Sequence, residues 1–136
     1  MSAIRSALGG RRGRGFRGLG ERRKIVKLPK DAVISQDKLL RYLLLPREEN
    51  DKARFLALAG YTLANWEVLE YDLRQLIAKR EVSGVEASPF GTKYEVRGSL
   101  TGPNGKVLHV VTVWIKLEAT GETRFVTLFP DREVAR

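Results

Sequence analysis

The chain has 136 residues, of which 43% are apolar and 30% charged, and its formal net charge is +9 at pH 7. The lack of cysteine excludes disulfides and cysteine-based metal or thiol sites, and a single histidine excludes a multi-histidine metal site. This length suits one domain, and without an apolar run of 18 residues we expect no membrane span and, from the composition, no cofactor.

The positive charge is concentrated at the start of the chain. Residues 1–30 hold ten basic side chains and one acidic one, which gives +9, whereas residues 31–136 hold 15 of each and are neutral overall. Residues 1–23 are expected to form a flexible Arg/Gly-rich arm, because they offer too little apolar surface to offset the entropy of ordering. Its candidate nucleic-acid-binding residues are Arg11, Arg12, Arg14 and Arg17. The arm equally suits an acidic partner protein or a plain linker, and these alternatives stay open.

A single α+β domain is expected over residues 24–130, followed by a short tail over 131–136. The domain starts with an extended lead-in that includes residues 32–34. A first helix is expected over residues 36–45, because Ser35 can cap it and Pro46 ends it.

Two further helices are expected. One begins near residues 48–51, where acidic side chains suit the helix dipole, and ends at Gly60. The other is capped by Asn65 and closes at Lys79 and Arg80. Its apolar residues recur at three-four spacing and predict a buried face, with charged residues on the outer face. The buried face holds Trp66, Leu69, Leu73, Leu76 and Ile77, and the outer face holds Glu67, Glu70 and Arg74.

The period then changes to that of strands, after a loop from Ser83 to Gly91 that is rich in serine, glycine and proline. Strands are expected over residues 93–100, 106–117 and 123–129, joined by turns at Gly102–Gly105 and Ala119–Glu122. Links this short make an antiparallel meander, so we predict N-terminal helices packed on a three- to four-stranded antiparallel sheet.

The middle strand is apolar on both faces, which is typical of a central strand covered by helices on one side. One face holds Val107, His109, Val111, Val113, Ile115 and Leu117, and the other holds Leu108, Val110, Thr112, Trp114 and Lys116. Strict alternation in the last strand puts Arg124 and Val126 on one face, and Phe125, Thr127 and Phe129 on the other.

Polar side chains interrupt these apolar strands, although no general catalytic motif is present. Thr112, Arg124 and Thr127 are expected to gather with Arg97 on an open sheet face, which would suit metal-free RNA cleavage. His109 is a candidate catalytic residue, with Lys52 or His109 as the proton-transfer group; the alternative for a single histidine on an apolar face is a structural role. An ordinary solvated sheet edge is the alternative for the whole group.

Three lysines complete the candidate residues. Lys52 is a candidate catalytic residue, and Lys38 and Lys106 are candidate nucleic-acid-binding residues. The alternative for Lys38 and Lys52 is that they simply face solvent from amphipathic helices.

Three blocks of the sequence resemble an uncharacterised family of small bacterial domains over about residues 27–130. The blocks are Lys38–Leu44 with Asp51–Phe55 and Gly60–Tyr61, then Lys93–Gly98 with Gly102–Lys106, and finally Val111–Ile115 with Arg124–Pro130. Members of that family occur alone and as C-terminal modules of large secreted or contact-dependent toxins. Their toxin context and layout are similar to the barnase/EndoU/colicin/RelE group of metal-independent ribonucleases.

The resemblance implies a toxin-like ribonuclease that acts without metal in the cytoplasm, after delivery into a target cell. It also implies RNA as substrate and an acidic immunity protein as partner. The polar positions that match the family are Lys38, Lys52, Lys106, Thr112, Trp114, Arg124 and Thr127, and His109 does not match. Two alternatives remain: a non-catalytic nucleic-acid-binding or assembly protein that uses the arm, and an antitoxin or immunity-type partner.

Overall fold

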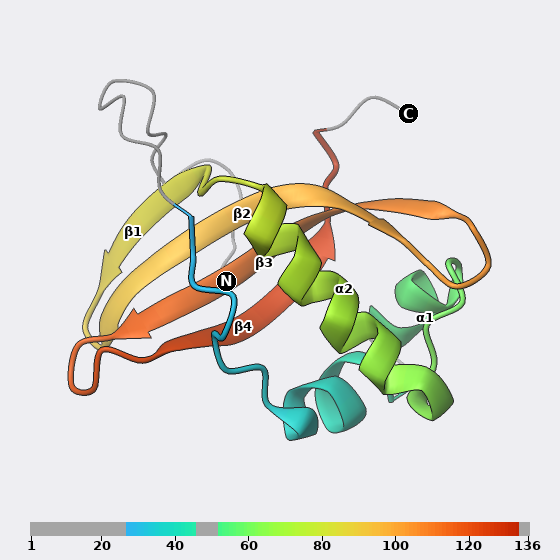
Figure 1. The fold of residues 1–136 in the computed structure, drawn as a ribbon, viewed down its shortest axis with the longest axis horizontal. Helices are drawn as coiled ribbons and strands as arrows, with labels where there is room; N and C mark the ends of the chain where they lie inside the picture. The colour runs from blue at the N-terminus through green and yellow to red at the C-terminus, as the bar shows by residue number, and fades with distance from the viewer. Residues whose placement is uncertain (1–26, 46–51, 134–136) are drawn as a thin grey trace.

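The computed structural model describes residues 27–45 and 52–133, in which helices precede a sheet (Figure 1). The helical elements are η2 (Lys38–Leu43), α1 (Lys52–Ala57), η3 (Leu63–Asn65) and α2 (Trp66–Lys79). The strands are β1 (Gly84–Ser88), β2 (Gly91–Thr101), β3 (Val107–Leu117) and β4 (Thr123–Pro130). The sheet is antiparallel in the order β1-β2-β3-β4, so the predicted α+β class and meander are confirmed.

The strand β1 was expected to be loop. Its five residues pair with β2 from Gly84 opposite Glu95 to Ser88 opposite Gly91. Its glycine and serine residues are typical of loops, so the sequence shows no clear alternation of apolar and polar residues here. Pairing with β2 supplies the hydrogen bonds that make the segment a strand.

The helix α2 lies across one face of the sheet (Figure 1), and the predicted inner positions Leu69, Leu73, Leu76 and Ile77 are buried there. Gly98 of β2 lets the two layers approach, because a Cβ at this position would lie 3.1 Å from the Leu76 side chain. The sheet contributes Val96, Leu100, Leu108, Val110, Trp114, Phe125 and Leu128 to this core.

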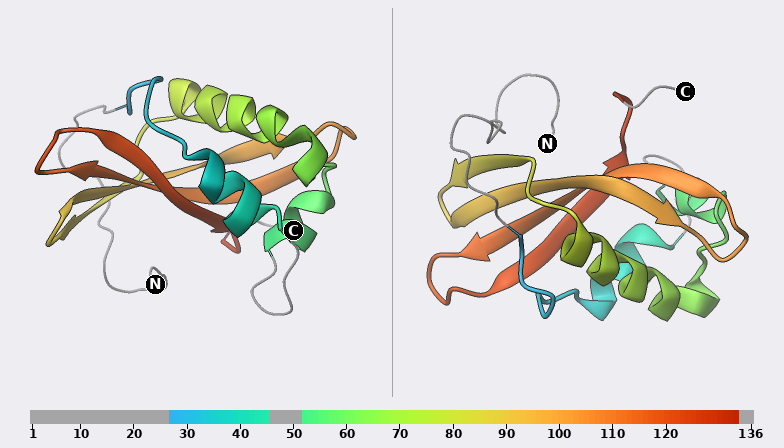
Figure 2. Two further views of the ribbon diagram at one scale, coloured as in Figure 1. Left: turned by 90° about the horizontal axis from the view of Figure 1, so that it is seen from below. Right: turned by 45° about the horizontal axis from the view of Figure 1, so that its top comes forward.

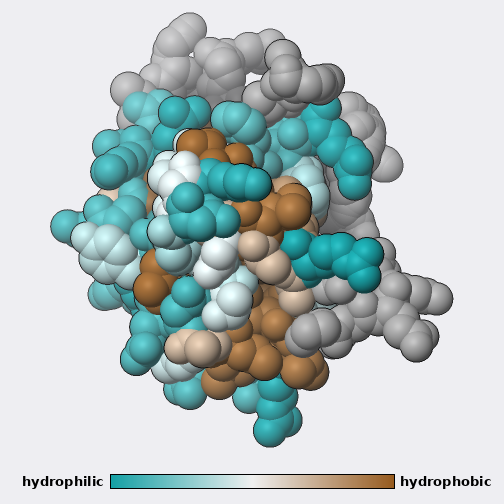
Figure 3. Space-filling model, turned by 90° about the vertical axis from the view of Figure 1, so that its right-hand side faces the viewer, coloured by the Kyte–Doolittle hydropathy of each residue, from teal (hydrophilic) through white to brown (hydrophobic). Residues whose placement is uncertain are grey.

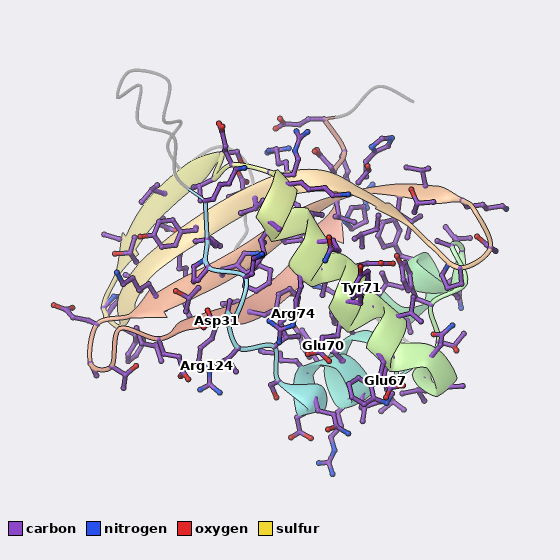
Figure 4. All side chains as sticks on the ribbon, in the orientation of Figure 1. Asp31, Glu67, Glu70, Tyr71, Arg74 and Arg124 are labelled. Carbon is purple, nitrogen blue, oxygen red and sulfur yellow. The ribbon has the colours of Figure 1, made fainter. Side chains whose placement is uncertain are left out.

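Arg74, expected on the solvated face of α2, instead holds the N-terminal lead-in. Its Nη1 donates to the carbonyl oxygens of Lys30 at 2.9 Å and Ala32 at 2.7 Å, and Nη2 contacts Glu70 Oε2 at 3.0 Å. In Figure 4 the Arg74 side chain points from α2 towards this segment. The lead-in then reaches β4, where Val33 forms a parallel bridge with Arg124.

The first helix differs from the α-helix expected over 36–45. It is a π-helical turn, closed by the Leu44 N–H donating to the Leu39 carbonyl at 2.9 Å, an i to i−5 bond. Leu39, Leu43 and Leu44 are all buried, and a wider turn brings these three positions to one side. Packing therefore overrides the local preference for an α-helix.

The predicted turn at Gly102–Gly105 packs on the end of α1. The Asn104 N–H donates to the Ala59 carbonyl at 3.2 Å, and Asn104 Nδ2 donates to the Leu58 carbonyl at 3.0 Å. Asn65, expected to cap α2, holds the preceding turn instead, since its Oδ1 accepts from the Thr62 N–H at 2.7 Å. No described helix is long and apolar enough to cross a membrane.

A bulge in β4 changes which side chains share a face. Phe125 pairs with Trp114, and Thr127 pairs with the adjacent residue of β3, Val113. Val126 therefore has no partner residue on β3 and is the extra residue of the bulge. Phe125 therefore lies on the same face of the sheet as Trp114, while Thr127 and Arg124 both lie on the other face. The prediction that Phe125 and Thr127 share a face was wrong, because strict alternation does not allow for the added residue.

Candidate active site at the edge of β4

Two of the predicted site residues meet at the edge of the sheet. Lys52, the first residue of α1, donates from Nζ to Thr127 Oγ1 of β4 at 3.0 Å. Both side chains are half-buried. The contact joins residues 75 positions apart in the sequence, so it exists only because η2 and α1 pack beside this outer strand.

Tyr42 of η2 is the second component. Its ring centroid lies 5.0 Å from Lys38 Nζ and 5.6 Å from Lys52 Nζ, so two ammonium groups share one ring. Figure 2 shows η2 beside the end of β4, with α1 next to it. The π-helical turn thus carries both Lys38 and Tyr42 to the same edge, and turns of this kind are frequent at functional sites.

Arg124 completes the group from β4. Its side chain is exposed at the sheet's edge (Figure 4), and Nε lies 3.6 Å from Glu122 Oε1. Partial burial lowers the pKa of the Lys38 ammonium, and the Arg124 charge lowers it further. The two cations therefore act on each other. We call Lys38, Tyr42, Lys52, Arg124 and Thr127 the β4-edge cluster.

The β4-edge cluster combines three cationic groups with a phenol and a hydroxyl. Arg124 is exposed and has Glu122 as a partner, whereas Lys38 is partly desolvated and feels the Arg124 charge, so an anion bound beside both would relieve that repulsion. Within the described residues, no group of three or more histidine, aspartate or glutamate side chains could hold a metal ion. The donors present at the β4 edge suit a phosphate, since ammonium and guanidinium groups both bind phosphate oxygens.

Residues 26–132 match the model of a family described as a domain of unknown function, DUF6883. The chain belongs to the DUF6883 family. This DUF6883 chain is also similar to a solved structure of a "Contact-dependent growth inhibition toxin - immunity protein complex from Klebsiella pneumoniae 342". The two share 18% identity and a TM-score of 0.58, over 74% of this chain and 100% of that chain, which shows a common fold. No curated protein matches.

Thr112 lies in the core of the DUF6883 domain and is not part of the β4-edge cluster. Its side chain is fully buried, its hydroxyl donates to the Val96 carbonyl at 2.8 Å, and it accepts from Trp114 Nε1 at 2.8 Å. These two hydrogen bonds satisfy the hydroxyl as a donor and as an acceptor, which a buried polar group requires. Thr112 therefore stabilises the fold, and the phosphate-site role expected for it does not fit its position.

His109 also lies away from the β4-edge cluster. It is exposed on β3, where it pairs with Ser99. Thr127 pairs with Val113, four residues further along β3, so His109 lies about 13 Å along the strand from the residue opposite Thr127. Arg97, expected to gather with Thr112, Arg124 and Thr127, contacts carboxylates instead. Its contacts are Asp131 Oδ1 at 2.7 Å, Glu95 Oε2 at 3.5 Å and Glu133 Oε1 at 3.6 Å.

Of the remaining predicted residues, the structure describes Lys106 alone. Lys106 is exposed in the β2–β3 turn, where its N–H donates to Asn104 Oδ1 at 2.9 Å. The arm positions Arg11, Arg12, Arg14 and Arg17 lie outside the described residues. Sequence reasoning missed Tyr42 as a site residue, although its position four residues after Lys38 was the available signal.

Proposed function

We propose that this DUF6883 chain is the ribonuclease domain of a bacterial toxin system and that the β4-edge cluster is its active site. The observation that carries the proposal is the Lys52–Thr127 contact beside Lys38 and Arg124. The fold shared with a toxin–immunity protein complex supports the toxin system. RNA would be the substrate, cut in the cytoplasm of a target cell after delivery.

RNA can be cut by its own 2′-hydroxyl, so the protein must supply proton transfer and positive charge. In the proposed reaction the 2′-oxygen forms a bond to phosphorus and the bond from phosphorus to the 5′-oxygen breaks. One proton leaves the 2′-hydroxyl for a base, and another passes from an acid to the 5′-oxygen. The products are a 2′,3′-cyclic phosphate and a 5′-hydroxyl end.

Lys38 is the proposed base, because its pKa is lowered and its Nζ lies over the same ring as Lys52 Nζ. Lys52 is the proposed acid, since its ammonium carries a proton and is held in place by the Thr127 hydroxyl. Arg124 would bind the non-bridging phosphate oxygens through its guanidinium. Lys52 and Arg124, joined by Lys38 as it takes up the proton, would stabilise the extra negative charge of the transition state.

The test is incubation of the purified full chain with total RNA or tRNA in EDTA. We expect cleavage that leaves cyclic phosphate ends, and a loss of roughly 100-fold or more in Lys52→Gln and in Arg124→Ala. Lys79→Gln is the matched control, because Lys79 is exposed at the far end of α2 and should leave the rate unchanged. RNA that stays intact with the wild-type chain would rule the proposal out.

The assignment of Lys38 has its own readout in the same assay. The rate should rise with pH through an ionisation below the ordinary lysine pKa of about 10.4, and Lys38→Arg should lose that rise. An unchanged pH profile in Lys38→Arg would remove Lys38 as the base without affecting the cleavage result.

An immunity-type role is the second candidate, because the similar solved structure is a complex of a toxin and an immunity protein. Expression in a bacterium separates the two roles. A toxin domain should arrest growth when expressed alone, and Lys52→Gln should relieve the arrest. An immunity protein should be harmless alone and should protect against another protein.

For the toxin role, we also propose an acidic immunity protein as the partner. Figure 3 shows apolar surface at the end of the molecule that includes α1. Leu58 after α1 and Leu63 in η3 are large apolar side chains exposed at that end, with Leu58 56% exposed. An acidic protein seated there would bury this apolar surface and place carboxylates at the neighbouring cations.

A further inference from the structure

The Tyr42 ring is the one part of the β4-edge cluster that the proposed reaction does not use. It is 38% exposed, although η2 is otherwise anchored by leucines. Leu39 and Leu43 are fully buried and hold the π-helical turn on the core. The Tyr42 ring lies at the surface, and both ammonium groups lie over it.

An exposed aromatic ring beside cations is the arrangement with which proteins bind unpaired nucleotides. The base stacks on the ring while the neighbouring phosphates are held by lysine or arginine. Here the Lys38 and Lys52 ammonium groups lie 5.0 and 5.6 Å from the ring centroid. A nucleotide whose phosphate rests on these lysines would therefore have its base within reach of the ring.

We propose that Tyr42 stacks on an unpaired base next to the phosphate held by Lys38 and Lys52, so that the site selects single-stranded RNA. The inference rests on the proposed function for the identity of the anion. Bases inside an A-form duplex are already stacked and cannot reach a side chain, so a paired substrate would gain nothing from the ring.

A competing role for Tyr42 is to hold the two lysines in position through its π face. The two roles differ in what they require of the ligand. A stacking ring adds affinity only when a base is present, whereas a ring that positions lysines adds affinity for any phosphate chain. An oligonucleotide without bases therefore separates them.

The experiment measures binding of the full chain to a short single-stranded 2′-O-methyl oligonucleotide, which cannot be cut because its 2′-oxygen is blocked. Its abasic counterpart has the same phosphates, so charge contributions from the N-terminal arm cancel in the comparison. We expect Tyr42→Ala to weaken binding of the base-bearing strand roughly tenfold and to leave the abasic strand unchanged. Tyr42→Phe keeps the ring and should bind like wild type.

Other outcomes overturn the inference. Equal weakening of both strands by Tyr42→Ala would mean that the ring positions the lysines, and no effect on either would mean that it does not contact RNA. Unfolding curves check that Tyr42→Ala is folded, with Tyr42→Leu as a second variant if it is not. Tyr42-dependent binding without any RNA cleavage would refute the proposed function alone, and cleavage with Tyr42-independent binding would refute this inference alone.

Discussion

Tyr61 is the most buried of the four tyrosines, at 1% exposure, and it joins two parts of the helical layer. Its hydroxyl donates to Asp72 Oδ2 of α2 at 2.6 Å. Burial, the hydrogen bond and the Asp72 charge together raise the pKa of the Tyr61 phenol far above its usual range. The neutral phenol is thus part of what holds the segment after α1 against α2.

We predict that Tyr61→Phe lowers the free energy of unfolding by about 1–3 kcal/mol at pH 7, measured by urea denaturation. The Tyr61 contribution has a pH signature as well. Its pKa is higher in the folded state, so the contribution is complete below the unfolded value of about 10 and is lost as pH rises above it. Tyr61→Phe should lack that alkaline loss.

Tyr71→Phe is the control, because the Tyr71 ring is 62% exposed on α2 and its loss of a hydroxyl should leave stability unchanged. An alkaline loss of the same size in the wild-type chain and in Tyr61→Phe would contradict the prediction.

Thr112 and Thr127 show how far single residues could be predicted. Both are threonines in apolar strands, so the same role was expected of both. One is buried with both hydrogen bonds met inside the core, and the other meets Lys52 at the sheet's edge. Whether a given threonine is buried or lies at the sheet's edge depends on the β4 bulge and on where α1 packs, and local periodicity encodes neither.

At the scale of secondary-structure elements, the β2–β3 turn packs closely on the segment that follows α1. A Cβ at Gly102 would overlap the Ala59 carbonyl oxygen, whereas a Cβ at Gly105 would meet nothing within 4 Å. Gly105 instead has a φ of +89°, which disfavours other residues through local backbone strain. The two glycines are therefore needed for different reasons, within one four-residue turn.

We predict that Gly102→Ala destabilises the chain by about 3 kcal/mol or more, because the turn must move away from α1. Gly105→Ala should cost about 1–2 kcal/mol, the strain of a left-handed alanine alone. Thermal unfolding of both variants measures the difference. Equal losses would mean that the turn does not depend on its contact with Ala59.

The elements that periodicity defines were predicted well, and those that tertiary contacts define were not. The inner face of α2 and the central place of β3 follow from three-four spacing and two-sided hydrophobicity. The π-helical form of η2 follows from the burial of three leucines, and β1 exists because β2 pairs with it. Local sequence does not contain either of these contacts.

For the whole molecule, charge and candidate site are separate features. The excess of +9 belongs to residues 1–30, while the β4-edge cluster belongs to a part of the chain that is neutral overall. The arm would add affinity for any polyanion, whereas the cluster would act on one phosphate. Binding and cleavage should therefore respond differently when the arm is removed.

We predict that deleting residues 1–22, which contain six arginines, weakens RNA binding and lowers its salt dependence but leaves cleavage at saturating RNA intact. At about 0.7 per phosphate contact on single strands, the slope of log K against log salt should fall by up to about 4. Filter binding over a salt series and the EDTA assay measure the two properties. A deletion that abolishes cleavage even at saturating RNA would mean that the arm takes part in cleavage and that the two features are not separate.

The bulge at Val126 has a practical consequence for anyone who redesigns this protein. In a straight strand Thr127 would have pointed into the core opposite Thr112, and Leu128 would have pointed outward; the added residue exchanges them. Leu128 is in fact fully buried. A surface redesign that counts every second residue from Arg124 would therefore put a solubilising charge at Leu128, in the interior, and would miss Thr127, which lies on the face that it meant to change.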